Sequence, residues 1–297
     1  MYQLFTASLQ DILTASEEDI GTETDGKEKL VGDFMELTLS IVLLCIFITS
    51  FIFSMFGRGG GDFYLPIILT FLPINYYTAA GISLFLIVVQ GLSMTLIYHK
   101  KHRLIDWKLA IILGSIIALS SFLGGVLSYK IPEIYLKLSF SCFLLISSYL
   151  LYRNYNLTIK HWRIGLWKRE AAGITYTVNL LYIVFPILLA SFMASMSGIS
   201  GGGLIIPICT LFGGVPLRIA MGTNTFLVLI SSSMGFIGHL TRGGFDLSLG
   251  IKLVLMVILG SQLGSRIHVK IKEEKLRKGF SIILIIAALW MLIKIFI

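Results

Sequence analysis

Charged residues are scarce in this sequence. They make up 13% of its 297 residues, whereas a soluble globular chain carries about 25%. Hydrophobic residues reach 56% and the mean hydropathy is +0.88, so there is too little polar surface to cover a water-soluble particle. The composition therefore excludes a soluble domain and predicts an integral membrane protein with several spans.

Cysteine is also scarce. The three residues all lie inside apolar segments, with no CxxC pair and no histidine at ligand-like spacing: Cys45, Cys142 and Cys209. This pattern argues against a disulfide framework. We interpret the cysteines as small buried hydrophobic residues, and no metal site is expected.

Acidic residues are few outside the N-terminal region. Nine of the sixteen fall within residues 1–36, and most of the other seven lie in loops. The sequence also lacks a Walker loop, an HExxH motif, a GxSxG motif and a carboxylate pair suited to face a cavity. We therefore expect neither an enzyme nor a cofactor.

The acidic N-terminal residues form a predicted tail, residues 1–33. The tail lacks the basic region and the following apolar core that are typical of a signal peptide. We expect a disordered or loosely helical segment instead. Beyond residue 36 the chain carries 22 basic residues. Because they occupy short loops between apolar runs, they indicate orientation in the bilayer and not a nucleic-acid partner.

Apolar runs long enough to cross a bilayer, about 20 residues each, recur along the chain. They cover residues 34–56, 76–98, 107–129, 134–152, 174–197, 217–240, 248–268 and 276–296. Two further stretches, 63–72 and 204–213, reach only about half of the bilayer thickness as helices. Each follows a glycine run, at 57–61 and 198–203, so we predict short broken helices there.

The glycine runs belong to an internal repeat. A shift of 141 residues places Gly60 on Gly201, Gly61 on Gly202, Pro66 on Pro207, Ala79 on Ala220, Gly81 on Gly222 and Phe85 on Phe226, and a shift of 140 places His99 on His239, Asp106 on Asp246 and Gly124 on Gly264. The chain then divides into the tail, a first transmembrane repeat at 34–152, a basic cytoplasmic linker at 153–173 and a second transmembrane repeat at 174–297.

Loop charge distinguishes two topologies. If both short segments cross the membrane and the N-terminus lies outside, the cytoplasmic loops hold 17 basic residues and the outer loops five. If both turn back and the N-terminus lies inside, the split is 12 against 10. The positive-inside rule favours the first arrangement. We therefore expect an all-α polytopic membrane protein of two inverted repeats, each with about five transmembrane segments.

The glycine runs are the first candidate site. Irregular backbone at membrane depth is tolerated only inside protein or beside a water-filled cavity, and broken helices in matching positions of two inverted halves indicate a transporter substrate site. The N–H groups that open each short helix favour an anion. Close helix packing through small residues is the alternative. The candidate glycines are Gly59, Gly60, Gly61, Gly201, Gly202 and Gly203.

Polar side chains inside the apolar spans extend this site. Ser83 and the repeat-related Thr223 and Asn224 are suited to donate to substrate oxygens; hydrogen bonding between helices is the alternative. Arg58, inside the first glycine run, is suited to an oxyanion or to an ion pair with nearby Asp62. Both interpretations of Arg58 stay open at this point.

Other polar residues have mainly structural interpretations. His99 and His239 are expected at membrane interfaces, with proton coupling as the alternative. Asp106 and Asp246 are expected to cap the helices they precede. Gln90, within an apolar span, is a weaker candidate for the site.

A double motif resembles the sulfite exporter TauE/SafE family. The pattern is a Gly-x-x-Gly-Gly-Gly run, a proline a few residues later, and Ala-x-Gly-Thr/Ser-x in the next helix. The second copy lies at 198–203, Pro207 and 220–224. The first copy lies at 57–61, Pro66 and 80–83, and its glycine run is one residue shorter than the pattern. The turn at 105–107 also looks like a turn of the family. The resemblance covers about residues 36–297, although Ile82 stands where the family has a small hydroxyl residue.

The resemblance implies a secondary transporter of small anions, typically sulfite, sulfonates or related organosulfur and carboxylate compounds, coupled to protons or to the membrane potential. We expect alternating access, a multi-pass location in the plasma membrane and an external N-terminus. The expected partners are a small anionic substrate, a coupling ion and the lipid bilayer, and oligomerisation is left open. An anion channel and a non-transporting membrane scaffold are the alternative functions.

Overall fold

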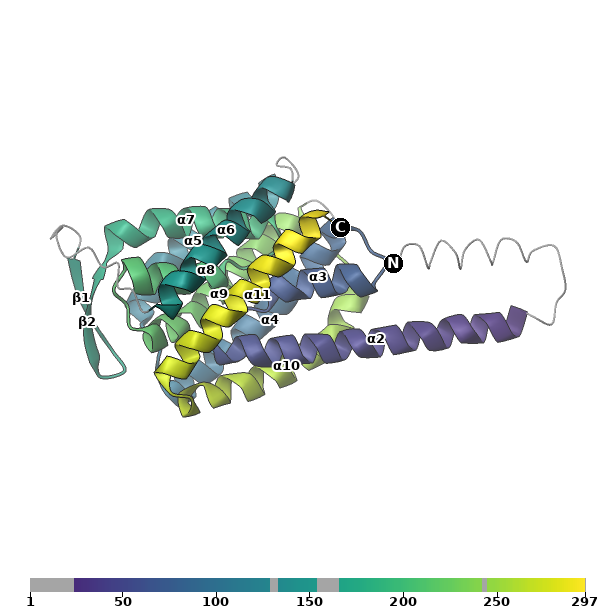
Figure 1. Ribbon diagram of the computed structural model, residues 1–297, viewed down its shortest axis with the longest axis horizontal. Helices are drawn as coiled ribbons and strands as arrows, with labels where there is room; N and C mark the ends of the chain where they lie inside the picture. The colour runs from purple at the N-terminus through teal and green to yellow at the C-terminus, as the bar shows by residue number, and fades with distance from the viewer. Residues whose placement is uncertain (1–23, 129–132, 154–165, 242–244, 297) are drawn as a thin grey trace.

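Long helices running side by side make up most of the protein in a computed structural model, which describes residues 24–128, 133–153, 166–241 and 245–296 (Figure 1). In chain order the elements are α2 (Thr24–Met55), α3 (Gly61–Phe71), α4 (Tyr76–Ile97), the π-helical turn η1 (Tyr98–His102), α5 (Trp107–Leu127), α6 (Glu133–Tyr152), β1 (Leu166–Ala171), β2 (Ile174–Asn179), α7 (Leu180–Met196), α8 (Gly202–Pro207), the π-helical turn η2 (Ile208–Phe212), α9 (Leu217–Leu240), α10 (Leu247–Ile267), the 3₁₀ turn η3 (His268–Lys270) and α11 (Glu273–Phe296).

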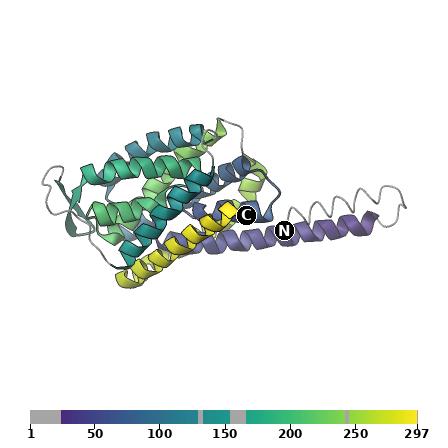
Figure 2. The same ribbon diagram turned by 45° about the horizontal axis from the view of Figure 1, so that its top comes forward.

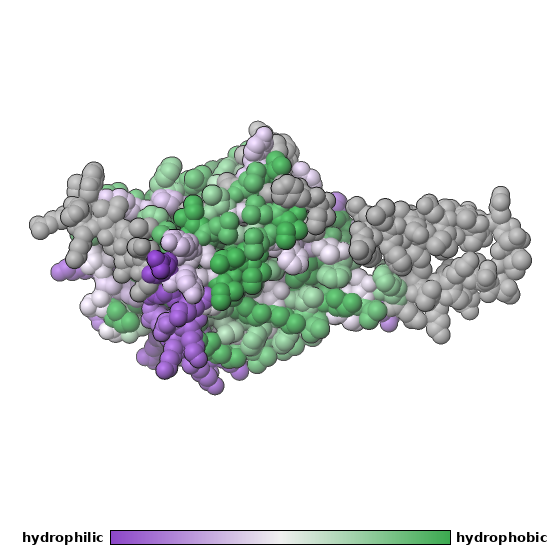
Figure 3. Space-filling model, in the orientation of Figure 1, coloured by the Kyte–Doolittle hydropathy of each residue, from purple (hydrophilic) through white to green (hydrophobic). Residues whose placement is uncertain are grey.

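Within the described residues, five helices are long and apolar enough to cross a membrane. They are Phe34–Met55, Tyr76–His102, Trp107–Leu127, Leu217–Leu240 and Leu247–Ile267. Large apolar side chains cover the outside of these helices, including Ile111, Leu119 and Leu255. Figure 3 shows a broad hydrophobic surface on one face of the protein. Lipid tails are the environment that such a surface fits. The protein is therefore an all-α polytopic membrane protein.

Both predicted short helices are present after the glycine runs. α3 has 11 residues and contains Pro66. α8 has six residues, ends at Pro207 and continues into η2. Proline lacks the backbone N–H that a regular helix interior needs, which fits the change from α-helical to π-helical bonding directly after Pro207.

Helix packing repeats itself between the two halves. α5 packs on α9 and α10 packs on α4; α5 also packs on α7, and α10 on α2. Two glycines related by the repeat permit the contacts of α5 with α7 and of α10 with α2. A β-carbon on Gly124 would lie less than 3.0 Å from the Phe192 carbonyl oxygen, and one on Gly264 less than 3.0 Å from the Phe51 carbonyl oxygen. These paired contacts follow the predicted repeat. The inverted orientation of the halves stays a prediction from the loop charges.

A β-hairpin joins the two halves, where a transmembrane run was expected to begin at residue 174. β1 and β2 pair antiparallel around Ala172 and Gly173, whose positive φ angles of 53° and 75° suit a two-residue hairpin turn. The alternating β-branched and aromatic residues of Ile174–Asn179 favour a strand, so α7 begins only at Leu180. Residues 154–165 of the predicted linker lie outside the described residues.

The predicted acidic tail overlaps the first helix. Residues 1–23 lie outside the described residues, whereas residues 24–33 form the start of α2. Figure 2 shows this part of α2 projecting beyond the ends of the other helices.

Candidate functional site

The two glycine breaks begin with equivalent glycines in a left-handed conformation. Gly57 has a φ of 63° and Gly198 a φ of 73°, values at which a β-carbon is strained. Gly57 lies against the carbonyl group of Met221 on α9, and Gly198 lies against Ala80 on α4. The repeat relates both members of these pairs, so each half places its break against the same position of the other half.

The two breaks also touch each other. A β-carbon on Gly59 would lie 3.0 Å from the Ser200 hydroxyl oxygen, and one on Gly61 would lie 3.5 Å from the Ile199 Cα atom. All of the candidate glycines are buried, namely Gly59, Gly60, Gly61, Gly201, Gly202 and Gly203. The structure thus brings together two segments that lie about half a chain apart.

Asn224 connects the two breaks through hydrogen bonds. Its Nδ2 donates to the carbonyl oxygen of Gly57 at 2.8 Å and to that of Gly202 at 3.4 Å. Its Oδ1 and the hydroxyl of Ser83, the repeat-related position, are both buried and have no hydrogen-bond partner within the part of the chain that the structure describes. Buried polar groups are normally satisfied, and the Ser83 hydroxyl is suited to donate to an anionic ligand or to water. The amide nitrogen of Asn224 binds backbone carbonyls and not a substrate oxygen as expected, and its Oδ1 is suited to accept from water or another donor.

Arg58 lies where the breaks meet. The residue is 0% exposed, and its guanidinium stands 5.2 Å from the ring centre of Phe53 and packs against Gly203 at the start of α8. The side chain of Asp62, the alternative partner considered above, lies outside the described residues. Arg58 therefore places a buried cation beside the N-terminus of the second short helix.

Gln90, the weaker candidate, organises the first break. Its Oε1 accepts hydrogen bonds from the Gly60 N–H at 2.8 Å and from the Tyr64 hydroxyl at 2.9 Å. Its Nε2 donates to the Ser54 hydroxyl at 2.9 Å. The only sequence signal for this role is an amide within an apolar span.

Replacing Gln90 with leucine is expected to lower the thermal stability of the protein. The Gly60 N–H and the Tyr64 hydroxyl lose their acceptor, and each unsatisfied buried group costs about 1–3 kcal/mol. Thermal unfolding of the purified protein in detergent measures the effect. Gln262→Leu is the matched control, because Gln262 is partly buried and its Nε2 donates to Ser93; an equal loss in both variants contradicts a special role for Gln90.

Tyrosine and histidine side chains hold the helix ends that lead into the breaks. At the end of α2, Tyr98 donates to the Met55 carbonyl at 3.1 Å, and His268 Nδ1 lies 2.7 Å from the same oxygen. Near the end of α7, His239 Nε2 lies 3.1 Å from the Ser195 carbonyl. Carbonyl oxygens only accept, so both imidazoles donate. His239 is buried where α9 packs against α7, and its expected position near a membrane interface stays a prediction.

The two aspartates cap their helices as expected. Asp106 Oδ1 accepts from the Leu109 N–H, and Asp246 Oδ1 accepts from the Leu249 N–H, each at 3.1 Å. Their surroundings differ, because Asp106 is buried and Asp246 is exposed. The sequence repeat identifies the shared cap but not this difference.

Asp106 also receives two side chains from the hairpin. Arg169 donates through Nε to Oδ2 at 3.0 Å and through Nη2 to Oδ1 at 2.5 Å, and Tyr176 donates to Oδ2 at 2.6 Å. Burial raises the pKa of Asp106, but the hydrogen bonds from Arg169 and Tyr176 outweigh it and bring the pKa below the ordinary 3.8. The stabilisation is therefore present at neutral pH and is lost only as the pH falls through this lowered value.

Thr223 faces this aspartate from α9. The backbone N–H of Asp106 donates to the Thr223 hydroxyl oxygen at 3.0 Å, which leaves the hydroxyl hydrogen of Thr223 available for another acceptor. Thr223 precedes Asn224 in the chain, so the predicted polar pair lies between the breaks and the loop before α5.

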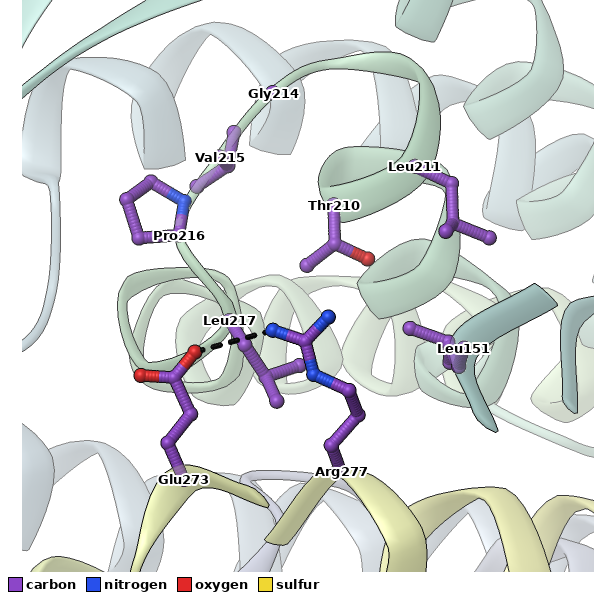
Figure 4. A pocket seen from close by; sticks show the side chains of 9 residues that line it. All are labelled: Leu151, Thr210, Leu211, Gly214, Val215, Pro216, Leu217, Glu273 and Arg277. Atoms are coloured by element: carbon purple, nitrogen blue, oxygen red, sulfur yellow. Dashed lines mark hydrogen bonds and ion pairs between the residues drawn. The ribbon is translucent and has the colours of Figure 1, made fainter. Parts of the chain in front are cut away.

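A separate cavity of about 250 Å³ lies between the loop that follows η2 and the start of α11 (Figure 4). Its lining includes Thr210, Leu217, Glu273 and Arg277, and Arg277 donates to Glu273 at 3.3 Å. The glycine breaks do not line this cavity. No cluster of histidine, cysteine and acidic side chains that could hold a metal ion occurs within the described ranges.

Comparison with known proteins identifies relatives over most of the chain. The model of the family "Sulfite exporter TauE/SafE" matches residues 42–291. A protein described as a probable membrane transporter from Methanocaldococcus jannaschii is 27% identical, over 89% of this chain and 99% of its own length. The probable membrane transporter YunE of Bacillus subtilis is 26% identical, over 84% of this chain and 96% of its own length.

A plant relative matches a shorter region. Sulfite exporter TauE/SafE family protein 5 of Arabidopsis thaliana is 32% identical, over 36% of this chain and 24% of its own length. No solved structure matches the chain significantly.

Proposed function

The chain belongs to the sulfite exporter TauE/SafE family of membrane transporters, and we propose that it is a secondary transporter of a small anion. The substrate class is sulfite, a sulfonate or a related organosulfur or carboxylate compound. The contact between the two glycine breaks is the observation that carries the proposal, because matched broken helices meeting inside a transporter are a typical substrate site.

The chemistry around the breaks favours an anion. α3 and α8 both begin at the breaks, and the first N–H groups of a helix have no acceptor within that helix. The buried guanidinium of Arg58 lies beside Gly203, and the Thr223 hydroxyl hydrogen is available to an acceptor. Helix N-termini, a guanidinium and a hydroxyl donor together form the kind of environment that binds an oxyanion.

The proposed transport cycle is alternating access. The two repeats, inverted relative to each other, rock around the contact between the breaks, with the N-terminus outside the cell and the basic loops in the cytoplasm. The glycine contacts are tightly packed, which corresponds to a closed state of the site. A proton or the membrane potential drives the movement of the anion across the plasma membrane.

Flux measurements in proteoliposomes test this function. The purified protein is expected to move at least one of sulfite, a sulfonate and thiosulfate, and the flux is expected to change with an imposed potential or pH gradient. Moving one charge across 100 mV involves about 2.3 kcal/mol, so the dependence is large. Protein-free liposomes are the control. An absence of flux under every gradient contradicts the proposal, and unitary currents far above transporter turnover would identify a channel instead.

A further inference from the structure

The hairpin between the two halves is attached to the transport core at one buried carboxylate. Arg169 on β1 and Tyr176 on β2 are direct cross-strand partners, so their side chains lie on the same face of the hairpin. Both donate to Asp106, whose side chain is 0% exposed. Figure 1 shows the hairpin at one end of the molecule, beside the ends of several long helices.

This attachment continues to the glycine breaks. The Asp106 N–H donates to Thr223, and the next residue, Asn224, donates to the Gly57 carbonyl. The loop before α5 also lies directly on α9, since a β-carbon on Gly222 would stand 2.5 Å from the Leu104 carbonyl oxygen. A continuous path of side chains and backbone therefore links the hairpin to the candidate site.

Helix capping alone does not account for these contacts. A cap needs one side-chain oxygen, and the repeat-related Asp246 provides it while remaining exposed. Burying a carboxylate is unfavourable unless it is paired and hydrogen-bonded. The pairing of Asp106 with Arg169 and Tyr176 thus attaches the hairpin to the helices at one end of the molecule. Within the described residues, no repeat-related copy of β1 and β2 occurs at the other end.

We propose that Asp106, Arg169 and Tyr176 form a clamp that positions Thr223 and keeps the hairpin end of the candidate site closed, and that this end opens when the clamp releases. The link to transport rests on the proposed function. Asp106 is a positioning residue in this scheme, because it acts on the site through Thr223 and the hairpin.

Cys209 offers a direct reporter of clamp release. It lies in η2, directly after the second short helix, and it is only 4% exposed. Tyr176 packs against the hydrophobic cluster that contains Cys209, and the two side chains lie close enough to interact electrostatically. If the hairpin moves away with Tyr176, the Cys209 thiol becomes accessible to reagents.

The test measures the rate at which N-ethylmaleimide modifies Cys209 in the purified full-length protein, in a background with Cys45→Ser and Cys142→Ser. Asp106→Asn keeps a good helix cap but removes the charge that Arg169 binds. This variant and Arg169→Gln are each expected to raise the rate about tenfold, the effect of losing one hydrogen bond to a charged group. Arg169→Lys, which keeps the charge, is expected to restore part of the protection.

Two controls separate clamp release from general loosening. Asp246→Asn changes the equivalent cap and is expected to leave the Cys209 rate unchanged. A companion background that retains Cys45 on α2 and replaces Cys142 and Cys209 with serine reports on the remainder of the protein, and its rate is expected to stay at the wild-type value. An unchanged Cys209 rate in both clamp variants overturns the proposal, as does an equal rise at Cys45.

The labelling experiment needs no substrate, so it is independent of the proposed function. Increased labelling in a protein that moves no anion supports the clamp and contradicts the transport assignment. Normal protection of Cys209 in both clamp variants of a protein that does transport anions contradicts the clamp alone.

Discussion

Replacing Gly57 with alanine is expected to lower anion flux by at least about tenfold. A β-carbon in this left-handed conformation costs about 1–2 kcal/mol. It would also overlap the carbonyl group of Met221, and such overpacking destabilises a folded protein by about 1–3 kcal/mol more. About 1.4 kcal/mol corresponds to a factor of ten in rate. If even part of the cost of the added β-carbon falls on a conformation that transport requires, the flux therefore drops by this factor or more. Flux in proteoliposomes measures the loss.

Gly114→Ala is the matched control for this substitution. Gly114 lies within α5, and the nearest atom to its added β-carbon is 3.6 Å away on Phe226, an ordinary contact distance. Alanine favours a helix interior over glycine by about 1 kcal/mol, so folding and flux are expected to persist. Size-exclusion chromatography of both variants checks assembly. Flux in Gly57→Ala at the wild-type level would falsify a functional role for the first break.

Replacing Asn224 with alanine is the second change with a large expected effect. The carbonyls of Gly57 and Gly202 both lose their donor, and the direct connection between the breaks through this amide disappears. An unsatisfied buried group costs about 1–3 kcal/mol, so flux is expected to fall at least tenfold, roughly. Asn224→Asp is expected to be worse, because its carboxylate repels both the Gly57 carbonyl and an anionic substrate.

Ser232→Ala on the same helix is the control for Asn224. The Ser232 hydroxyl donates to the Val228 carbonyl within α9, an interaction that the backbone does not need to keep its helix. Its loss is expected to leave flux and thermal stability close to wild type. If Asn224→Ala and Ser232→Ala behave alike in both measurements, the amide has no special role between the breaks.

The glycine breaks could be recognised from the sequence because their constraint is local. A run such as Gly57–Gly61 cannot be a regular membrane helix exposed to lipid, and Pro66 in the following stretch adds a second local signal. The short helix α3 then follows from the length of the apolar stretch alone. The residue against which Gly57 packs, Met221, depends on how α9 is placed, and nothing in the sequence around Gly57 indicates it.

The hairpin shows where the local interpretation failed. Counting apolar residues assigned Ile174–Asn179 to a span, although the alternation of that segment favours a strand. Its partner strand, Leu166–Ala171, carries three charged residues in its middle and was assigned to the basic linker. The cap formed by Asp106 was predictable from the helix that follows it, whereas its pairing with Arg169, 63 residues further on, required the fold.

The sequence by itself determined that this is a membrane protein, where most of its apolar helices lie and where two short helices follow glycine breaks. Those features follow from hydropathy, helix length and the need of each backbone group for a partner inside a bilayer, all of which act within one segment. Only the tertiary structure decided which polar groups meet: Asn224 with both breaks, Arg58 with Gly203, and Asp106 with the hairpin. Such pairings depend on the packing of distant helices, and a single segment carries no record of them.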